Sequence, residues 1–235
     1  MKVALFVPCY VNQLYPQVAI ATLELLEKLG CQVDFPMEQV CCGQPLANAG
    51  FAHFAEKCTR EFQSVFAGYE HVVVPSGSCT LHLKEHTGFS GQVWELIEFL
   101  TDVLGKTSWQ GDFPFRVGYH ASCHGLRGLR LAQMSELHAP YFSKPLSVLK
   151  QLKGIELIEL NRKDECCGFG GTFSVMEEAV SVRMGKDRLR DHEQKGVTYI
   201  TGVDVSCLMH LEGIAKRQKS LVRFIHLAEI LNQTI

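Results

Sequence analysis

The sequence has almost no net charge, because 23 lysine and arginine residues are balanced by 25 aspartate and glutamate residues in a chain of 235. A basic surface able to hold a nucleic acid is therefore not expected. Apolar runs are short, and none approaches the roughly 20 residues of a membrane-spanning helix. The first run, residues 2–7, ends at Pro8 and lacks the length and cleavage site of a signal peptide. We therefore expect a cytoplasmic protein with no membrane span and no nucleic-acid partner.

Two common cofactor-binding patterns are also missing. There is no Cys-x-x-Cys-x-x-Cys run of the ferredoxin type, so any longer electron-transfer chain must lie in a partner. The glycine-rich stretch Gly168–Gly171 does not complete a dinucleotide fingerprint, because Phe173 stands where the third glycine is needed. Such a stretch before a helix can hold a phosphate or carboxylate, but we favour the interpretation that it makes room for a bulky neighbouring group.

Cysteine, by contrast, is abundant, with ten residues. Disulfides are not expected in a reducing cytoplasm, so metal or redox chemistry is the leading explanation. Cys41-Cys42 and Cys166-Cys167 are adjacent pairs. A disulfide between neighbours is strained, whereas two adjacent thiolates can both point to one metal site. For Cys31 and Cys58 we expect the simpler role of small buried hydrophobes.

The other eight cysteines form one constellation that occurs twice. Each copy has a single cysteine, a Cys-Cys-Gly triplet, and a final cysteine followed three positions later by histidine. The gaps are 32 and 37 residues in the first copy and 43 and 40 in the second, so the second copy has an insertion, mainly before its triplet. The first copy comprises Cys9, Cys41, Cys42, Cys79 and His82, and the second comprises Cys123, Cys166, Cys167, Cys207 and His210.

Short β-rich runs alternate with helical periodicity through both copies. In the first we expect strands at 2–7, 32–35 and 71–75 and helices at 16–29, 47–67, 79–86 and 92–104; in the second, strands at 115–119, 155–160 and 197–201 and helices at 146–153, 173–195, 207–217 and 221–232. This order predicts an α/β fold of two related Rossmann-like halves with parallel sheets and an internal pseudo-two-fold repeat. The predicted domains are residues 1–108 and 112–235, joined by a linker within 105–114.

The first and last cysteines of each constellation follow a predicted strand and precede a predicted helix. These are Cys9 and Cys79 in the first copy and Cys123 and Cys207 in the second. Ligands of parallel α/β sheets bind at the carboxyl ends of the strands, and a helix N-terminus favours thiolate over thiol. Each half can thus gather four thiolates, the number that iron–sulfur clusters prefer and that also suits zinc. Spacing alone does not choose between these metals. His82 and His210 are further candidate ligands, with a cap or a polar surface position as the alternative.

Other polar residues surround the second constellation. His120 and His124 flank Cys123, and either could act as an acid–base group or donate a hydrogen bond to a cluster sulfur. A role in local structure is the alternative for both. Arg127 and Arg130 could clamp a carboxylate substrate, although solvated surface positions explain them as well. The pattern identifies no catalytic residue.

The combination resembles the cysteine-rich CCG domain of the heterodisulfide reductase B subunit and of iron–sulfur subunits in glycolate- and glycerol-3-phosphate-oxidising complexes. The likeness is carried by residues 6–10, 75–79, 120–124, 166–171 and 204–210 and spans the whole chain. A chain of two such domains is similar to the lactate utilisation protein A family. That resemblance implies an oxidoreductase subunit that works with partner proteins B and C to oxidise L-lactate, a small 2-hydroxy acid, to pyruvate.

The same resemblance implies a [4Fe-4S] cluster in one or both halves, held by the eight repeated cysteines, which relays electrons or contacts the substrate. In heterodisulfide reductase this cluster is of a non-cubane type. The fuller motif ends in Cys-x-x-Cys, whereas His82 and His210 occupy the last position here, so a five-cysteine geometry is not implied. Two other functions stay open: a zinc-bearing or metal-free protein that assembles or docks a redox complex, and a thiol–disulfide oxidoreductase acting through Cys41-Cys42 or Cys166-Cys167.

Overall fold

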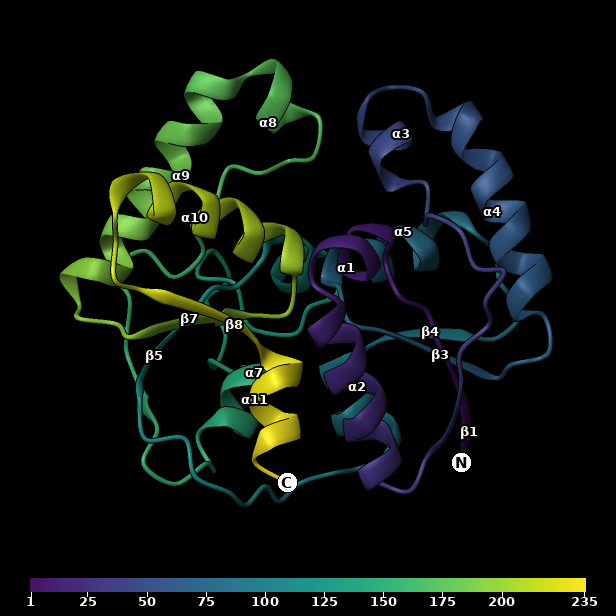
Figure 1. Cartoon of the computed structure of the whole chain (residues 1–235), viewed down its shortest axis with the longest axis horizontal. Coiled ribbons are helices and arrows are strands. Elements are labelled where there is room, and N and C mark those ends of the chain that lie inside the picture. Colours follow the sequence, from purple (N-terminus) through teal and green to yellow (C-terminus); the bar gives the residue numbers. More distant parts are fainter.

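Two four-stranded parallel sheets form the framework of the molecule, which a computed structural model describes from residue 1 to residue 235. The strand order is β2-β1-β3-β4 in the first sheet and β6-β5-β7-β8 in the second, so both halves have one topology. Helices pack around both sheets (Figure 1). The predicted α/β class, with two related parallel halves, is confirmed.

The first half contains β1 (Lys2–Leu5), α1 (Cys9–Leu14), α2 (Pro16–Lys28), β2 (Gln32–Asp34), α3 (Gln44–Asn48), α4 (Ala52–Phe66), β3 (His71–Val74), α5 (Gly77–His86), β4 (Gln92–Glu95) and α6 (Leu96–Glu98), which continues as the π-helical turn η1 (Phe99–Val103). The buried residues of its central strand β1 are all apolar: Val3, Ala4 and Leu5 are at most 2% exposed. Such runs are typical of parallel strands covered on both faces.

The second half contains β5 (Arg116–Tyr119), the π-helical turn η2 (His124–Gly128), α7 (Lys144–Leu149), β6 (Glu156–Leu157), α8 (Phe173–Met176), α9 (Glu178–Gln194), β7 (Tyr199–Gly202), α10 (Val205–Gln218), β8 (Arg223–His226) and α11 (Leu227–Gln233). In the first half α2 begins two residues after α1 ends, whereas residues 129–143 separate η2 from α7. The insertion expected from the cysteine spacing lies in this segment.

The helices predicted from residues 92 and 221 are wrong at their starts, where the structure has β4 and β8. Each strand passes into the next helix without a loop, and its last residue caps that helix. Glu95 accepts hydrogen bonds from the first turn of α6 and forms a capping box with Glu98, while His226 forms the corresponding box with Glu229 at α11. The same departure in both halves shows that the repeat extends beyond the cysteines.

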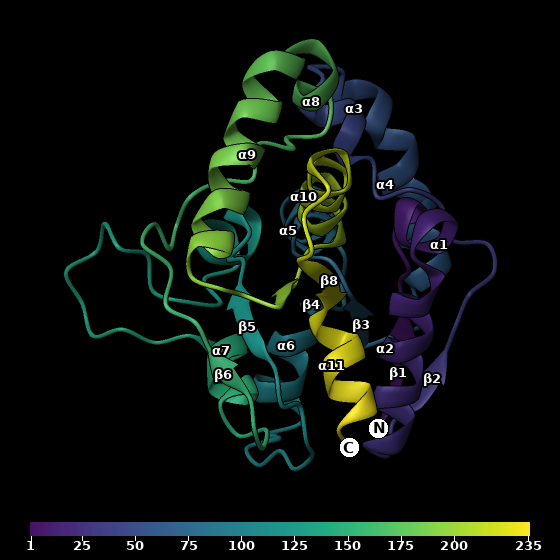
Figure 2. The same ribbon diagram turned by 60° about the vertical axis from the view of Figure 1, so that its left-hand side comes forward.

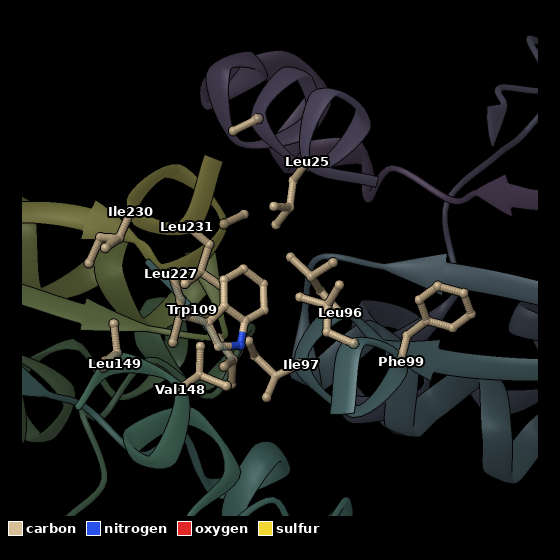
Figure 3. Close-up of a cluster of buried hydrophobic side chains, with 14 of the residues drawn as sticks. Leu25, Leu96, Ile97, Phe99, Trp109, Val148, Leu149, Leu227, Ile230 and Leu231 are labelled. Carbon is tan, nitrogen blue, oxygen red and sulfur yellow. The ribbon is translucent and has the colours of Figure 1, made fainter. Parts of the chain in front are cut away.

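The largest cluster of buried side chains joins the two halves. Helix α2 packs against α11, and Trp109, from the segment between the halves, is only 3% exposed within this cluster. Figure 3 shows side chains from both halves directed at one another, with Leu25, Leu96, Ile97, Phe99, Trp109, Val148, Leu149, Leu227, Ile230 and Leu231 labelled. Burial of such apolar surface is the main stabilising contribution to folding, so the two halves hold each other in a fixed relation.

Helices α3 and α8 lie at the same end of the molecule in both views (Figures 1 and 2). They belong to segments that follow the two Cys-Cys-Gly triplets, one in each half. Crossing a membrane would need a longer and more apolar helix than any the fold contains.

Candidate metal centre

One cavity of about 540 Å³ lies between the halves, and all eight repeated cysteines line it. The first half contributes Cys9, Cys41, Cys42 and Cys79, and the second contributes Cys123, Cys166, Cys167 and Cys207. Gln44 and Asn48 of α3 and Val175 of α8 also line it. The cavity therefore lies beyond the carboxyl ends of the strands, where ligands of parallel α/β sheets bind.

In the first constellation, four thiols from three segments come together. Cys9 is the first residue of α1, Cys79 lies in the first turn of α5, and Cys41-Cys42 precede α3. The Sγ atoms of Cys9 and Cys41 are 3.7 Å apart, and those of Cys42 and Cys79 are 3.2 Å apart. Cys42 and Cys79 are each 3% exposed, whereas Cys9 is open to solvent. The site is thus closed on its protein side and accessible on the other.

The glycine after each cysteine pair has a backbone conformation that other residues rarely adopt. Gly43 has φ +93° and Gly168 has φ +89°. This turn directs each amide back to the first sulfur of the pair, at 3.5 Å from Gly43 N to Cys41 Sγ and 3.3 Å from Gly168 N to Cys166 Sγ. The triplet therefore supplies two thiols and one amide donor to its site.

The sulfur atoms are electrostatically coupled within each site. Hydrogen bonds from Cys42 and then from Cys9 lower the pKa of Cys41, and hydrogen bonds from Cys123 and then Cys167 lower the pKa of Cys166. The same bonds raise the pKa of Cys9 and of Cys123, the partners that keep the proton. Each constellation thus readily forms a thiolate, the state that binds metals.

The second constellation includes a histidine that the first lacks. The sulfurs of Cys167 and Cys207 and a ring nitrogen of His120 lie within 4.8 Å of one another. His120 lines the cavity, is 1% exposed, and its Nε2 has no hydrogen-bond partner. Burial, with a smaller effect of the Arg188 charge, lowers the pKa of His120 to about 3. The ring is therefore neutral at physiological pH.

The other histidines from the sequence pattern have different surroundings. His124 lines the cavity, and its Nε2 is 3.2 Å from Nε2 of Gln44 in the other half. His82 is buried against His86, and His210 lies 3.4 Å from the Ser181 hydroxyl. Neither His82 nor His210 is part of the cavity wall. Their role as ligands stays a prediction.

The two arginines and the two cysteines outside the constellations do not line the cavity, whereas Gly170 and Gly171 of the glycine-rich stretch do. Arg127 pairs with Glu136, and neither Arg127 nor Arg130 lines the cavity. Cys31 is 7% exposed within the apolar core, which agrees with the role expected for it. Cys58 on α4 is only half-buried, so the buried position expected for it is not confirmed. Apart from its cysteines, the wall is built from neutral polar groups, histidines and apolar side chains, with no lysine or arginine.

Asp204 connects α5 and α10, the helices that carry Cys79 and Cys207. It is the N-cap of α10, the helix that carries Cys207, and is 1% exposed. Its carboxylate accepts a 2.7 Å hydrogen bond from the Ser206 hydroxyl and another of 2.7 Å from the Ser78 amide in the first turn of α5. The hydroxyl of Tyr10 donates to it as well, at 3.3 Å. One buried carboxylate therefore fixes the N-termini of α5 and α10 against each other.

Replacing Asp204 by alanine is expected to destabilise the protein by about 3 kcal/mol, because it removes a helix cap and leaves buried donors without their charged acceptor. Asp204→Asn keeps the cap and should lose less. Chemical denaturation followed by circular dichroism measures both variants. Asp112→Ala is the control, since the Asp112 side chain forms only an exposed pair with Lys153 at 3.9 Å. A cost for Asp204→Ala no larger than that of the control would show that the carboxylate does not join the halves.

Known proteins resemble this chain in sequence or in fold. A family model described as a cysteine-rich domain, CCG, matches residues 3–84 and again residues 117–212. Lactate utilization protein A of Geobacillus thermodenitrificans (strain NG80-2) is 37% identical, over 99% of this chain and 99% of its own length. The protein of that name from Bacillus subtilis (strain 168) is also 37% identical, with 99% of both chains covered.

One solved structure resembles this chain in fold but not in sequence. The crystal structure of a hypothetical protein from Helicobacter pylori superposes with a TM-score of 0.69 at 10% identity, covering 99% of this chain and 48% of that one. This chain thus spans about half the length of that structure. At such low identity the match shows the fold only.

Proposed function

This chain belongs to the lactate utilization protein A family of proteins with two CCG cysteine-rich domains, and from that premise we propose that it is the iron–sulfur subunit of a complex that oxidises L-lactate to pyruvate. The observation that carries the proposal is the single cavity lined by all eight repeated cysteines. The shared family name supports a role in lactate utilisation, and the donor set of the cavity supports the cofactor.

The residues present fit iron–sulfur clusters. Such clusters are held by cysteine thiolates, and each constellation offers four cysteines. Cys9, Cys41, Cys42 and Cys79 would hold one cluster, and Cys123, Cys166, Cys167 and Cys207 would hold the other. When bound, a cluster supplies one-electron oxidation and reduction. The resemblance implies a [4Fe-4S] cluster in one or both halves, and we propose one in each half.

The chain's own groups are placed to support such a cofactor. The amides of Gly43 and Gly168 donate to sulfur, and Cys79 and Cys207 sit in the first turns of helices whose positive ends offset thiolate charge. Asp204 holds these two helix ends together. Together these contacts keep the sulfur positions fixed while electrons are gained and lost.

We assign electron transfer, rather than binding of the 2-hydroxy acid, as the work of this cavity. A small carboxylate substrate is usually held by arginine or lysine, and the wall contains neither. Partner proteins B and C, proposed from the family, would then bind the substrate and carry electrons onward. The chain is in this proposal an oxidoreductase subunit that needs both partners.

Metal analysis of anaerobically purified protein tests the proposal. We expect enough iron and acid-labile sulfide per chain to fill both halves, and little zinc. Stoichiometric zinc without labile sulfide would instead favour a zinc-bearing assembly or docking protein. Metal-free protein that turns over a disulfide substrate would favour a thiol–disulfide oxidoreductase, for which the lowered pKa of Cys41 and Cys166 is the favouring observation.

A further inference from the structure

The two constellations differ in what lies behind them. In the first half Phe6, three residues before Cys9, is 1% exposed and packs against Phe62 and Phe66, with ring centroids 5.6 and 5.8 Å away. In the second half the corresponding position, three residues before Cys123, is His120. An apolar cluster therefore supports the first site, and a polar ring supports the second.

His120 is held by a fully buried arginine. Arg188 of α9 is 0% exposed, and its Nε donates a 3.1 Å hydrogen bond to Nδ1 of His120. Its Nη1 donates to the carbonyl of Arg162 and lies 3.6 Å from the carboxylate of Asp191. Asp191 is itself fixed, because it accepts from the amide of Asn161 at 3.1 Å. The guanidinium, and with it the imidazole, has a defined orientation.

This contact determines which nitrogen of His120 carries the proton. A guanidinium has only donors and does not lose its proton in proteins. Nδ1 must then accept with its lone pair, so the ring N–H is on Nε2. Nε2 is the nitrogen without a partner, and the sulfurs of Cys167 and Cys207 lie within 4.8 Å of a nitrogen of the ring. A metal-ligating histidine shows the reverse arrangement, since its second nitrogen donates to a carboxylate or carbonyl.

We propose that His120 is a hydrogen-bond donor to sulfur at the second site, and not a ligand, and that it gives the second site the higher reduction potential of the two. This inference rests on the proposed iron–sulfur function. A hydrogen bond to sulfur stabilises the more negative, reduced state, and the buried charge of Arg188 acts in the same direction. His82 and His210 occupy equivalent positions in the sequences of the two halves and neither lines the cavity, so we do not assign this difference to them.

The consequence concerns where an electron resides. An electron that enters this chain from a reduced donor protein settles at the second site, which Cys123, Cys166, Cys167 and Cys207 define. His120 and Arg188 are positioning residues in this scheme, because they act through the sulfurs.

An EPR-monitored redox titration of the anaerobically reconstituted protein tests this assignment. Wild-type protein should show two potentials, of which Cys167→Ala removes the higher. His120→Phe, which copies the first site, should lower that potential so that the ratio of reduced to oxidised cluster changes at least about tenfold, or about 59 mV for one electron. His120→Gln retains an N–H donor and should remain close to wild type.

Two results with the reconstituted protein would overturn the inference while leaving the iron–sulfur function intact. One is an unchanged second potential in His120→Phe. The other is a strong ¹⁴N hyperfine coupling that His120→Phe removes, which would make the histidine a ligand. Nitrogen NMR of the metal-free protein adds a readout without cofactor: we expect a protonated Nε2 and a bare Nδ1, and a protonated Nδ1 would contradict the assigned tautomer. Protein that holds no iron and no sulfide would instead refute the proposed function itself.

Discussion

Replacing Cys42 by alanine is expected to remove the first cluster and to leave the second in place, so that iron and labile sulfide fall to about half. Cys42 is 3% exposed, and its sulfur lies 3.2 Å from that of Cys79. Neither Cys31 nor Cys58 lines the cavity. Iron and sulfide per chain, measured after anaerobic reconstitution, give the result directly.

Two matched variants control this experiment. Cys167→Ala should produce the mirror image, with the second cluster lost and the first kept. Cys31→Ala removes another buried thiol, at 7% exposure in the apolar core, and should keep both clusters. Full iron content in Cys42→Ala, or a loss in Cys31→Ala as large as in Cys42→Ala, would contradict the assignment of ligands.

Gly168→Ala should destabilise the protein by about 3 kcal/mol and weaken the second site, because a left-handed backbone and a steric overlap act together. At φ +89°, an alanine Cβ would lie 2.6 Å from the carbonyl oxygen of Ser181 and 2.8 Å from Cβ of Met184. The loop cannot easily move aside, since the Ser181 hydroxyl donates a 2.7 Å bond to the Gly168 carbonyl. Denaturation of the metal-free protein and iron retention of the reconstituted protein measure the two effects.

Gly213→Ala is the matched control for this substitution. Gly213 lies within α10, and a Cβ there would meet nothing within 4 Å. Alanine in an open helical position should stabilise the protein by up to about 1 kcal/mol and leave both sites unchanged. Equal stability changes in the two variants would show that the turn at position 168 does not require glycine.

The sequence was sufficient to predict the repeat and the parallel α/β class, because both depend on local patterns. It was not sufficient for β4 and β8. Each has only four residues, Gln92–Glu95 and Arg223–His226, and passes into a helix with no intervening turn residue. A periodicity window that covers both elements is dominated by the helix. What makes these segments strands is the pairing of β4 with β3 and of β8 with β7, and such long-range contacts are not contained in local patterns.

The grouping of cysteines within each half could also be predicted, since strand ends and helix starts mark its place. The meeting of both groups in one cavity could not, because it depends on the packing of α2 against α11 and on the bonds of Asp204. Arg188 was missed for a related reason. It lies 68 residues from His120, on a helix rich in charged residues, where a fully buried guanidinium gives no local signal.

The most direct test of two cluster sites in one cavity is the EPR spectrum of the protein with both sites reduced. Cys42→Ala and Cys167→Ala should each give the simple signal of one isolated cluster. Wild-type protein should give a spectrum split or broadened by magnetic coupling between two neighbouring clusters. A wild-type spectrum equal to the sum of the two single-site spectra would contradict the shared cavity, and the absence of any iron–sulfur signal would contradict the proposed cofactor.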